Sequence, residues 1–136
     1  MLIVDAGPLV AAADADDRDH DRCVELLSTA RGPLLVPALV VAEVAYLLGT
    51  RIGPQSELAF AQSIADGELV AEPVLDPEWP RVAELTERYV DLPLGIVDAS
   101  LVVLAERHRA ETIASLDHRQ FTTVRPAHVK SFTLVP

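Results

Sequence analysis

Short apolar runs alternate with longer segments of helical spacing along this chain. The runs are almost wholly apolar and are bounded by turn-forming residues; they lie at residues 2–4, 34–36, 69–71, 112–116 and 132–135. Such runs predict strands, because a strand that is covered on both faces shows no alternation of polar and apolar positions. We therefore expect five short, buried strands.

The segments between these runs predict helices. Residues 38–48 are strongly apolar and are followed by Gly49, so we expect a buried helix that ends there. Asp76 is expected to cap a later helix, because its carboxylate can accept hydrogen bonds from the first turn. Strands that alternate with helices predict a parallel sheet with helices on both faces. No linker or repeat is visible, so we expect a single α/β domain over residues 1–136.

Four acidic residues interrupt or close the apolar segments: Asp5, Glu43, Asp98 and Asp117. A carboxylate in apolar surroundings is costly unless something pairs with it, and no Lys or Arg accompanies these four. Asp5 and Asp117 directly follow predicted strands. In open α/β sheets, functional sites form beyond the carboxyl ends of the strands. We expect these two acids to lie there.

Each aspartate taken alone also fits a turn or a helix cap. Glu43 is harder to explain in that way, because it lies inside a segment whose helical faces are nearly all apolar. We expect Glu43 either to be functional or to pair with a buried partner such as Arg51 or Tyr46. If the four carboxylates gather, they repel one another, and Mg²⁺ or Mn²⁺ relieves that repulsion because hard cations prefer oxygen ligands.

Composition and charge narrow the classes of function. Half of the 136 residues are hydrophobic and mean hydropathy is +0.26, which excludes a disordered chain. No apolar stretch is long enough for a membrane span, and no signal peptide is visible, so we expect a cytoplasmic protein with no membrane partner. The net charge of −10 argues against a general nucleic-acid coat, but it leaves a metal-dependent nuclease open.

The acids lie in four short motifs: VDAGPLV at 4–10, PALVVAEV at 37–44, VDASLV at 97–102 and IASLDHRQF at 113–121. In order and spacing these motifs resemble the PIN-domain ribonucleases, in particular the VapC-type toxins of bacterial toxin–antitoxin pairs. The resemblance covers essentially the whole chain. It implies a PIN-like three-layer α/β/α sandwich with a central parallel sheet.

The same resemblance implies the chemistry and the partners. Asp5, Glu43, Asp98 and Asp117 would be both the metal-binding and the catalytic acids of a Mg²⁺- or Mn²⁺-dependent endoribonuclease. Ser115 matches the Ser or Thr that family members often carry before the last acid. The implied partners are an RNA substrate, a cognate antitoxin and a second copy of the chain in a homodimer.

The sequence departs from the family pattern at Gly7, where a hydroxyl or amide residue is common, so support for the acids from that position is absent. Two non-catalytic functions stay open as alternatives: a phospho-receiver-like module and a PIN fold that only binds partners. A receiver needs an acidic pair after its first strand and a Lys after its last. Here Asp5 is followed by Ala and Gly, and Lys130 precedes the last predicted strand.

Overall fold

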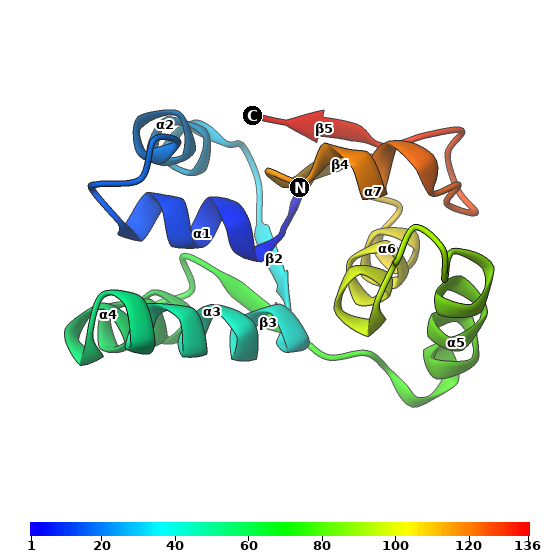
Figure 1. Cartoon of the computed structure of the whole chain (residues 1–136), viewed down its shortest axis with the longest axis horizontal. Coiled ribbons are helices and arrows are strands. Elements are labelled where there is room, and N and C mark those ends of the chain that lie inside the picture. The colour runs from blue at the N-terminus through cyan, green and yellow to red at the C-terminus, as the bar shows by residue number, and fades with distance from the viewer.

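Five short parallel strands form the centre of the molecule (Figure 1). The computed structural model describes residues 1–136, and its strands are β1 (Leu2–Val4), β2 (Leu34–Pro37), β3 (Val70–Glu72), β4 (Thr112–Ala114) and β5 (Thr133–Val135). Their order across the sheet is β3-β2-β1-β4-β5, and every neighbouring pair is parallel. The parallel sheet predicted from the apolar runs is confirmed, but only its inner strands are buried. The edge strands β3 and β5 are exposed or partly buried, because each has a neighbouring strand on one side alone.

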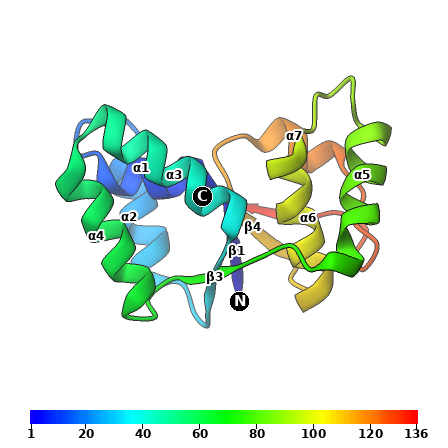
Figure 2. The ribbon, with the colours of Figure 1, turned by 90° about the horizontal axis from the view of Figure 1, so that it is seen from below.

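Two groups of helices enclose this sheet, as Figure 2 shows. One group is α1 (Ala6–Ala13), α2 (His20–Thr29), α3 (Ala38–Arg51) and α4 (Pro54–Ala65). The other is α5 (Trp79–Arg88), entered through the 3₁₀ turn η1 (Asp76–Glu78), then α6 (Ile96–His108) and α7 (His118–Thr123). The chain winds from β1 out to β3 and then returns to β4 and β5. Because crossovers between parallel strands are right-handed, this reversal puts the two groups on opposite faces and gives three layers.

Two helix boundaries differ from the sequence-based expectation. The helix that starts at residue 38 continues through Gly49 to Arg51. Gly49 faces α4, where a Cβ built on it would lie 3.0 Å from Oε2 of the exposed Glu57 side chain. Asp76 does not cap a helix; the Glu78 carboxylate instead accepts a hydrogen bond from the Leu75 N–H, at 2.8 Å.

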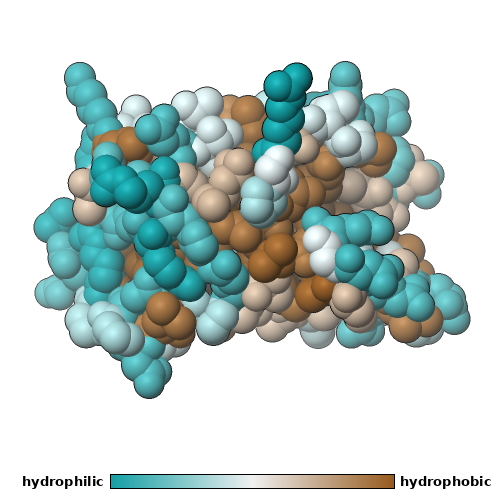
Figure 3. Space-filling view, turned by 180° about the vertical axis from the view of Figure 1, so that it is seen from behind, coloured by the Kyte–Doolittle hydropathy of each residue, from teal (hydrophilic) through white to brown (hydrophobic).

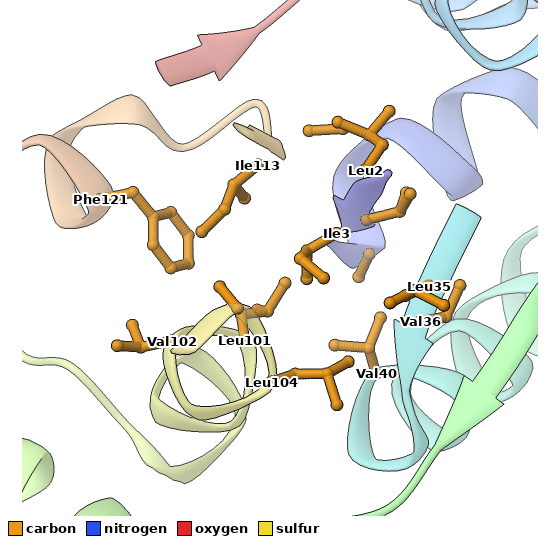
Figure 4. Close-up of a cluster of buried hydrophobic side chains, with 14 of the residues drawn as sticks. Leu2, Ile3, Leu35, Val36, Val40, Leu101, Val102, Leu104, Ile113 and Phe121 are labelled. Atoms are coloured by element: carbon orange, nitrogen blue, oxygen red, sulfur yellow. The ribbon is translucent and has the colours of Figure 1, made fainter. Parts of the chain in front are cut away.

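The hydrophobic core includes buried residues from both groups of helices, and Figure 4 shows the part between the sheet and helix α6. Ile3 and Ile113 come from adjacent strands, Leu101 points toward them from α6, and Leu104 lies beside Val40. Residues 99–105 of α6 are all buried, since this helix is covered by the sheet on one side and by α5 on the other. Each such Leu or Ile contributes roughly 1.5–3 kcal/mol to folding. Helix α6 therefore has a fixed position, and so does its first turn.

Ion pairs fasten the segment from β3 to α5 onto the other end of α6. The Arg107 guanidinium donates to Glu72 at 3.0 Å and to Glu78 at 3.1 Å. Arg81 forms a two-pronged pair with Glu106, at 3.0 and 2.8 Å. Such bidentate, partly buried pairs fix geometry as well as adding stability. They hold the layer of α5 and α6 in register with the sheet.

Apolar residues also reach the surface. The face opposite to that in Figure 1 has a central apolar area between hydrophilic margins (Figure 3). Among the large apolar side chains, Tyr46 is 71% exposed, Val90 63% and Ile96 54%. No helix is long and apolar enough to cross a membrane. Large exposed apolar patches are typical of surfaces that bind a partner.

Candidate active site

The chain reverses its direction across the sheet between β1 and β4, which makes this pair of strands the switch point of the fold. Val4 pairs with Ala114, so the carboxyl ends of the two strands are level. Asp5 follows β1 and donates its backbone N–H to the Ala114 carbonyl at 2.9 Å, and Asp117 follows β4. Sites in open α/β sheets form at this position. We refer to this side of the sheet as its carboxyl edge and to the opposite side as its amino edge.

The Asp5 carboxylate is held by two hydrogen bonds. Oδ1 accepts from the Ala6 N–H at 2.8 Å, and Oδ2 accepts from the Ser115 hydroxyl at 2.9 Å. Burial raises the pKa of Asp5, these two bonds lower it, and the nearby charge of Asp117 raises it further. Asp5 therefore does serve as the cap of α1, but only one of its oxygens is used in that way.

Ser115 connects the strand ends at the switch point. Its side chain is fully buried, and its hydroxyl donates to Asp5 while it accepts from the Asp117 N–H at 3.1 Å. Its own N–H donates to the Val135 carbonyl at the end of β5. One residue thus fixes the positions of two of the four acids relative to each other.

Asp98 reaches the same place from the opposite layer. It lies in the first turn of α6, and its Oδ2 accepts from the Gly95 N–H at 3.3 Å. Its half-buried position raises its pKa, and the charges of Asp5, Asp117 and Glu43 raise it further, to about 6. These three charges act on Asp98 because all four carboxyl groups lie close together.

Glu43 corrects one expectation. It is an exposed residue in the second turn of α3 and lies at the mouth of the cleft, not among buried apolar side chains. It makes no ion pair with Arg51 and no hydrogen bond with Tyr46. The atoms around its carboxyl group still remove some water, which raises its pKa, and Asp5 raises it further. Asp117 likewise makes no capping hydrogen bond to α7 through its side chain.

The four acids line one open cleft of about 520 Å³. The other lining residues are small, apolar or amide: Ala6, Gly7, Val97, Leu116 and Gln120. No Lys, Arg or His is among them, so no basic side chain neutralises the acids within the cleft. The sequence predicted Asp5 and Asp117 at the carboxyl edge, and the family resemblance implied Glu43 and Asp98 beside them. Sequence reasoning missed Gln120, whose spacing of three residues from Asp117 was the available signal.

The donor set of the cleft fits a hard divalent cation. It offers carboxylate oxygens alone, with no thiol or imidazole that would favour zinc. The only cysteine, Cys23, is buried on α2 and does not line the cleft. In this structure no three of the acids are placed to hold one metal ion together. Mg²⁺ commonly keeps several waters and takes only one or two protein carboxylates together with substrate phosphate, and an open arrangement suits that preference.

Gly7 has a structural reason in this chain. A Cβ built there would lie 3.3 Å from both Cβ and Cγ of Leu116, which is tighter than most such contacts. Leu116 therefore occupies the space that a hydroxyl-bearing side chain at position 7 would need. Ser115 supplies the hydroxyl to Asp5 from the neighbouring strand instead.

Comparison with known proteins gives the family. Residues 2–125 match the family model of the PIN domain. The chain belongs to the PIN-domain family. Across 99% of its length it is 37% identical to Ribonuclease VapC26 of Mycobacterium tuberculosis, and it covers 100% of that protein. The predicted resemblance to VapC-type PIN proteins is confirmed.

Solved structures agree on the fold. The chain matches VapC20 of M. tuberculosis, described as a toxin that cleaves the sarcin–ricin loop, with a TM-score of 0.82 at 18% identity over 96% of this chain and 99% of that one. It matches FitAcB from Neisseria gonorrhoeae with a TM-score of 0.68 at 15% identity over 89% and 91%. The PIN-like three-layer fold is therefore confirmed, and the phospho-receiver alternative is excluded.

Proposed function

We propose that this PIN-domain protein cleaves RNA with Mg²⁺ or Mn²⁺ held by Asp5, Glu43, Asp98 and Asp117. VapC-type PIN proteins are ribonuclease toxins, and membership of that type makes this chain one. One observation carries the metal site: four carboxylates from β1, α3, α6 and β4 meet in a cleft without a single basic side chain. Uncompensated acids in one cleft weaken the fold, so their gathering favours a role in binding a cation.

Each acid has a distinct position in the proposed reaction. A bound divalent cation supplies an acidified water and neutralises charge on the phosphoryl group. Asp5, fixed by Ser115 and the Ala6 N–H, and Asp98, fixed on α6, are the best-oriented ligands. Glu43 and Asp117 project from the cleft walls without a hydrogen bond to their carboxylates. They either complete the ligand set, directly or through water, or accept a proton from the attacking water.

The test compares Asp5→Asn with Asp66→Asn in an assay of labelled RNA cleavage with Mn²⁺. Asp66 is exposed beyond α4 and makes no side-chain hydrogen bond, so it controls for the loss of one charge. We expect Asp5→Asn to lose at least 100-fold in rate, Asp66→Asn to keep the wild-type rate, and EDTA to stop cleavage. Calorimetric titration with Mn²⁺ adds a readout that does not depend on activity. Cleavage by Asp5→Asn at the wild-type rate would refute the proposed site.

VapC-type toxins pair with antitoxins, and this chain offers an apolar groove for one. The groove has a volume of about 630 Å³ and lies between α4 and the pair α1 and α2, with Leu9, Val24, Leu27, Ala59 and Phe60 among its lining residues. Helices α3 and α4 do not enclose this groove between them. Those two helices pack directly on each other, so the groove opens on the other side of α4.

We propose that the antitoxin inserts an amphipathic segment into this groove. Ala59→Arg is expected to abolish co-purification with the antitoxin, and Ala61→Arg, on α4 but outside the groove, is the matched control. Equal loss in both variants would contradict the placement.

We further propose that residues 1–136 form one PIN-like domain and that the protein acts in the cytoplasm. We also propose that two copies of the chain form a homodimer. The exposed apolar side chains Tyr46, Val90 and Ile96 support association between copies. Light scattering after size exclusion tests the dimer, and a monomer at micromolar concentration would refute it.

A further inference from the structure

An acidic protein that binds RNA needs basic side chains to hold the phosphates. Most of the basic residues here are already paired or lie far from the cleft, which limits the candidates. Five arginines are in ion pairs with neighbouring acids: Arg18, Arg22, Arg81, Arg88 and Arg107. The Arg125 guanidinium is bonded to the Thr122 carbonyl. The remaining cations, which make no ion pair and no side-chain hydrogen bond, are Arg31, Arg51, Arg109, Arg119 and Lys130.

Most of these free cations lie far from the acids. Arg31, Arg109 and Lys130 each precede a strand, in the connections that enter β2, β4 and β5, so they lie at the amino edge of the sheet. Arg51 is the last residue of α3, about 20 Å along the helix from its start at the carboxyl edge. None of the four is placed to meet a strand of RNA that enters the cleft.

Arg119 differs from all of them. It lies in the first turn of α7, two residues after Asp117, and so at the carboxyl edge of the sheet beside the cleft. It is exposed and does not line the cleft, whereas its neighbour Gln120 does. The Gln120 amide donates to the Pro93 carbonyl at 3.3 Å, which ties α7 to the loop before α6. The base of the Arg119 side chain is therefore fixed while its guanidinium is free.

We propose that Arg119 binds a backbone phosphate of the RNA next to the scissile one. This inference rests on the proposed ribonuclease function. A guanidinium pairs with phosphate oxygens through two parallel hydrogen bonds. Because Arg119 lies at the rim and not in the cleft, it reaches a phosphate outside the acidic centre. It is the one unpaired cation at the carboxyl edge of the sheet. Its charge therefore offsets the repulsion between the acids of the cleft and the incoming RNA.

The experiment measures binding and cleavage separately. A fluorescein-labelled single-stranded RNA of mixed sequence is titrated with wild type, Arg119→Ala, Arg119→Lys and Arg31→Ala, with Ca²⁺ in place of Mg²⁺, at salt concentrations from 50 to 300 mM. Arg31 is an exposed, unpaired arginine at the opposite edge, so Arg31→Ala removes the same charge elsewhere. Cleavage with Mg²⁺ is then measured for KM and kcat.

We expect Arg119→Ala to bind roughly 5- to 10-fold more weakly at 100 mM salt, with most of its cleavage defect in KM. Its plot of log affinity against log salt should lose about 0.7 of slope, the contribution of one phosphate contact to a single strand. Arg119→Lys should recover part of the affinity, and Arg31→Ala should behave as wild type.

Two failures are distinguishable. If wild type binds and cleaves RNA but Arg119→Ala matches it in affinity and slope, or if Arg31→Ala is equally impaired, the assignment of Arg119 is overturned. If wild type neither binds nor cleaves RNA, the proposed function fails and this inference fails with it. Thermal melting of both alanine variants at the wild-type temperature excludes a folding defect.

Discussion

Replacing Asp98 by Asn is expected to make the metal-free protein more stable while it removes catalysis. Asp98 lies half-buried in the first turn of α6 and faces three other carboxylates. Asn keeps the shape of the side chain and an oxygen that accepts from the Gly95 N–H, but it carries no charge. A change that improves folding and destroys function is typical of a residue kept for its chemistry.

The size of the effect follows from the pKa of Asp98. Burial, with the charges of Asp5, Asp117 and Glu43, raises that pKa from 3.8 to about 6. The folded protein therefore binds this proton more tightly than the unfolded chain does. Its contribution to the free energy of unfolding is fully present below about pH 4 and is lost as the pH rises through about 6. A shift of about two units corresponds to roughly 3 kcal/mol, and solvent screening of a half-exposed group reduces this to about 1–1.5 kcal/mol.

Thermal unfolding followed by circular dichroism measures the difference. Wild type and Asp98→Asn are melted in EDTA from pH 5.2 to 8, a range kept above the sequence pI of 4.6 to limit aggregation. At pH 7.5 the variant should melt about 3–6 °C higher, and the gap should narrow toward pH 5.2. Added Mg²⁺ should raise the melting temperature of wild type more than that of the variant, because binding to the folded state stabilises it.

The melting temperatures would change in the opposite direction if the Asp98 carboxylate had a structural role. A carboxylate that caps α6, or that pairs with a basic side chain, stabilises the folded state when it is ionised. Asp98→Asn would then melt below wild type at pH 7.5, and the deficit would grow with pH. That result would refute the argument that the four acids repel one another in the absence of a cation.

Three further outcomes are expected. Ser115→Ala should lower the free energy of unfolding by about 2 kcal/mol, because it removes the partner of the partly buried Asp117 N–H and of Asp5 Oδ2, and should lower activity 10- to 100-fold; wild-type activity would contradict its positioning role. In urea unfolding, the change in the free energy of unfolding caused by Gly7→Ala should be about 1 kcal/mol more stabilising in a Leu116→Ala background than in wild type, because the contact with Leu116 is then absent. Additive effects of the two substitutions would argue against this contact. Arg81→Ala should cost about 1–2 kcal/mol in the same assay by removing the ion pair from Glu106, which keeps only its hydrogen bond from the Ala127 N–H, yet RNA cleavage should be unchanged; a matching loss of activity would mean that this ion pair also shapes the site.

Several features of the site were visible in the sequence because they depend on local order. Strands that end at residues 4 and 114 put Asp5 and Asp117 at strand ends, and parallel strands present those ends at one edge of a sheet. The sequence also offers fewer basic residues than acidic ones, and none of the basic side chains lines the cleft. The motifs around the four acids carried the resemblance to PIN domains, which the family comparison confirms.

Glu43 shows where sequence reasoning failed. Its neighbours in the chain are apolar, which suggested burial, but Ala42 and Tyr46 are exposed with it on the outer side of α3. An apolar helix is buried on every side only if neighbouring elements cover it. α6 is covered in that way and α3 is not. Whether an apolar face is enclosed is a property of the assembled layers, and the amphipathic pattern of one helix does not contain it.

The sequence by itself determined the alternation of strands and helices, the identity of the four acids and the chemistry that such oxygen ligands favour, because these depend on residue type and on short-range spacing. The tertiary structure alone decided that the acids share one cleft, that Ser115 joins Asp5 to Asp117, that Leu116 explains Gly7, and that Arg119 is the free cation beside the acids. These contacts connect residues that are far apart in the chain, such as Ser115 and Asp5, which are 110 positions apart. Packing and strand order set such distances, and no local pattern records them.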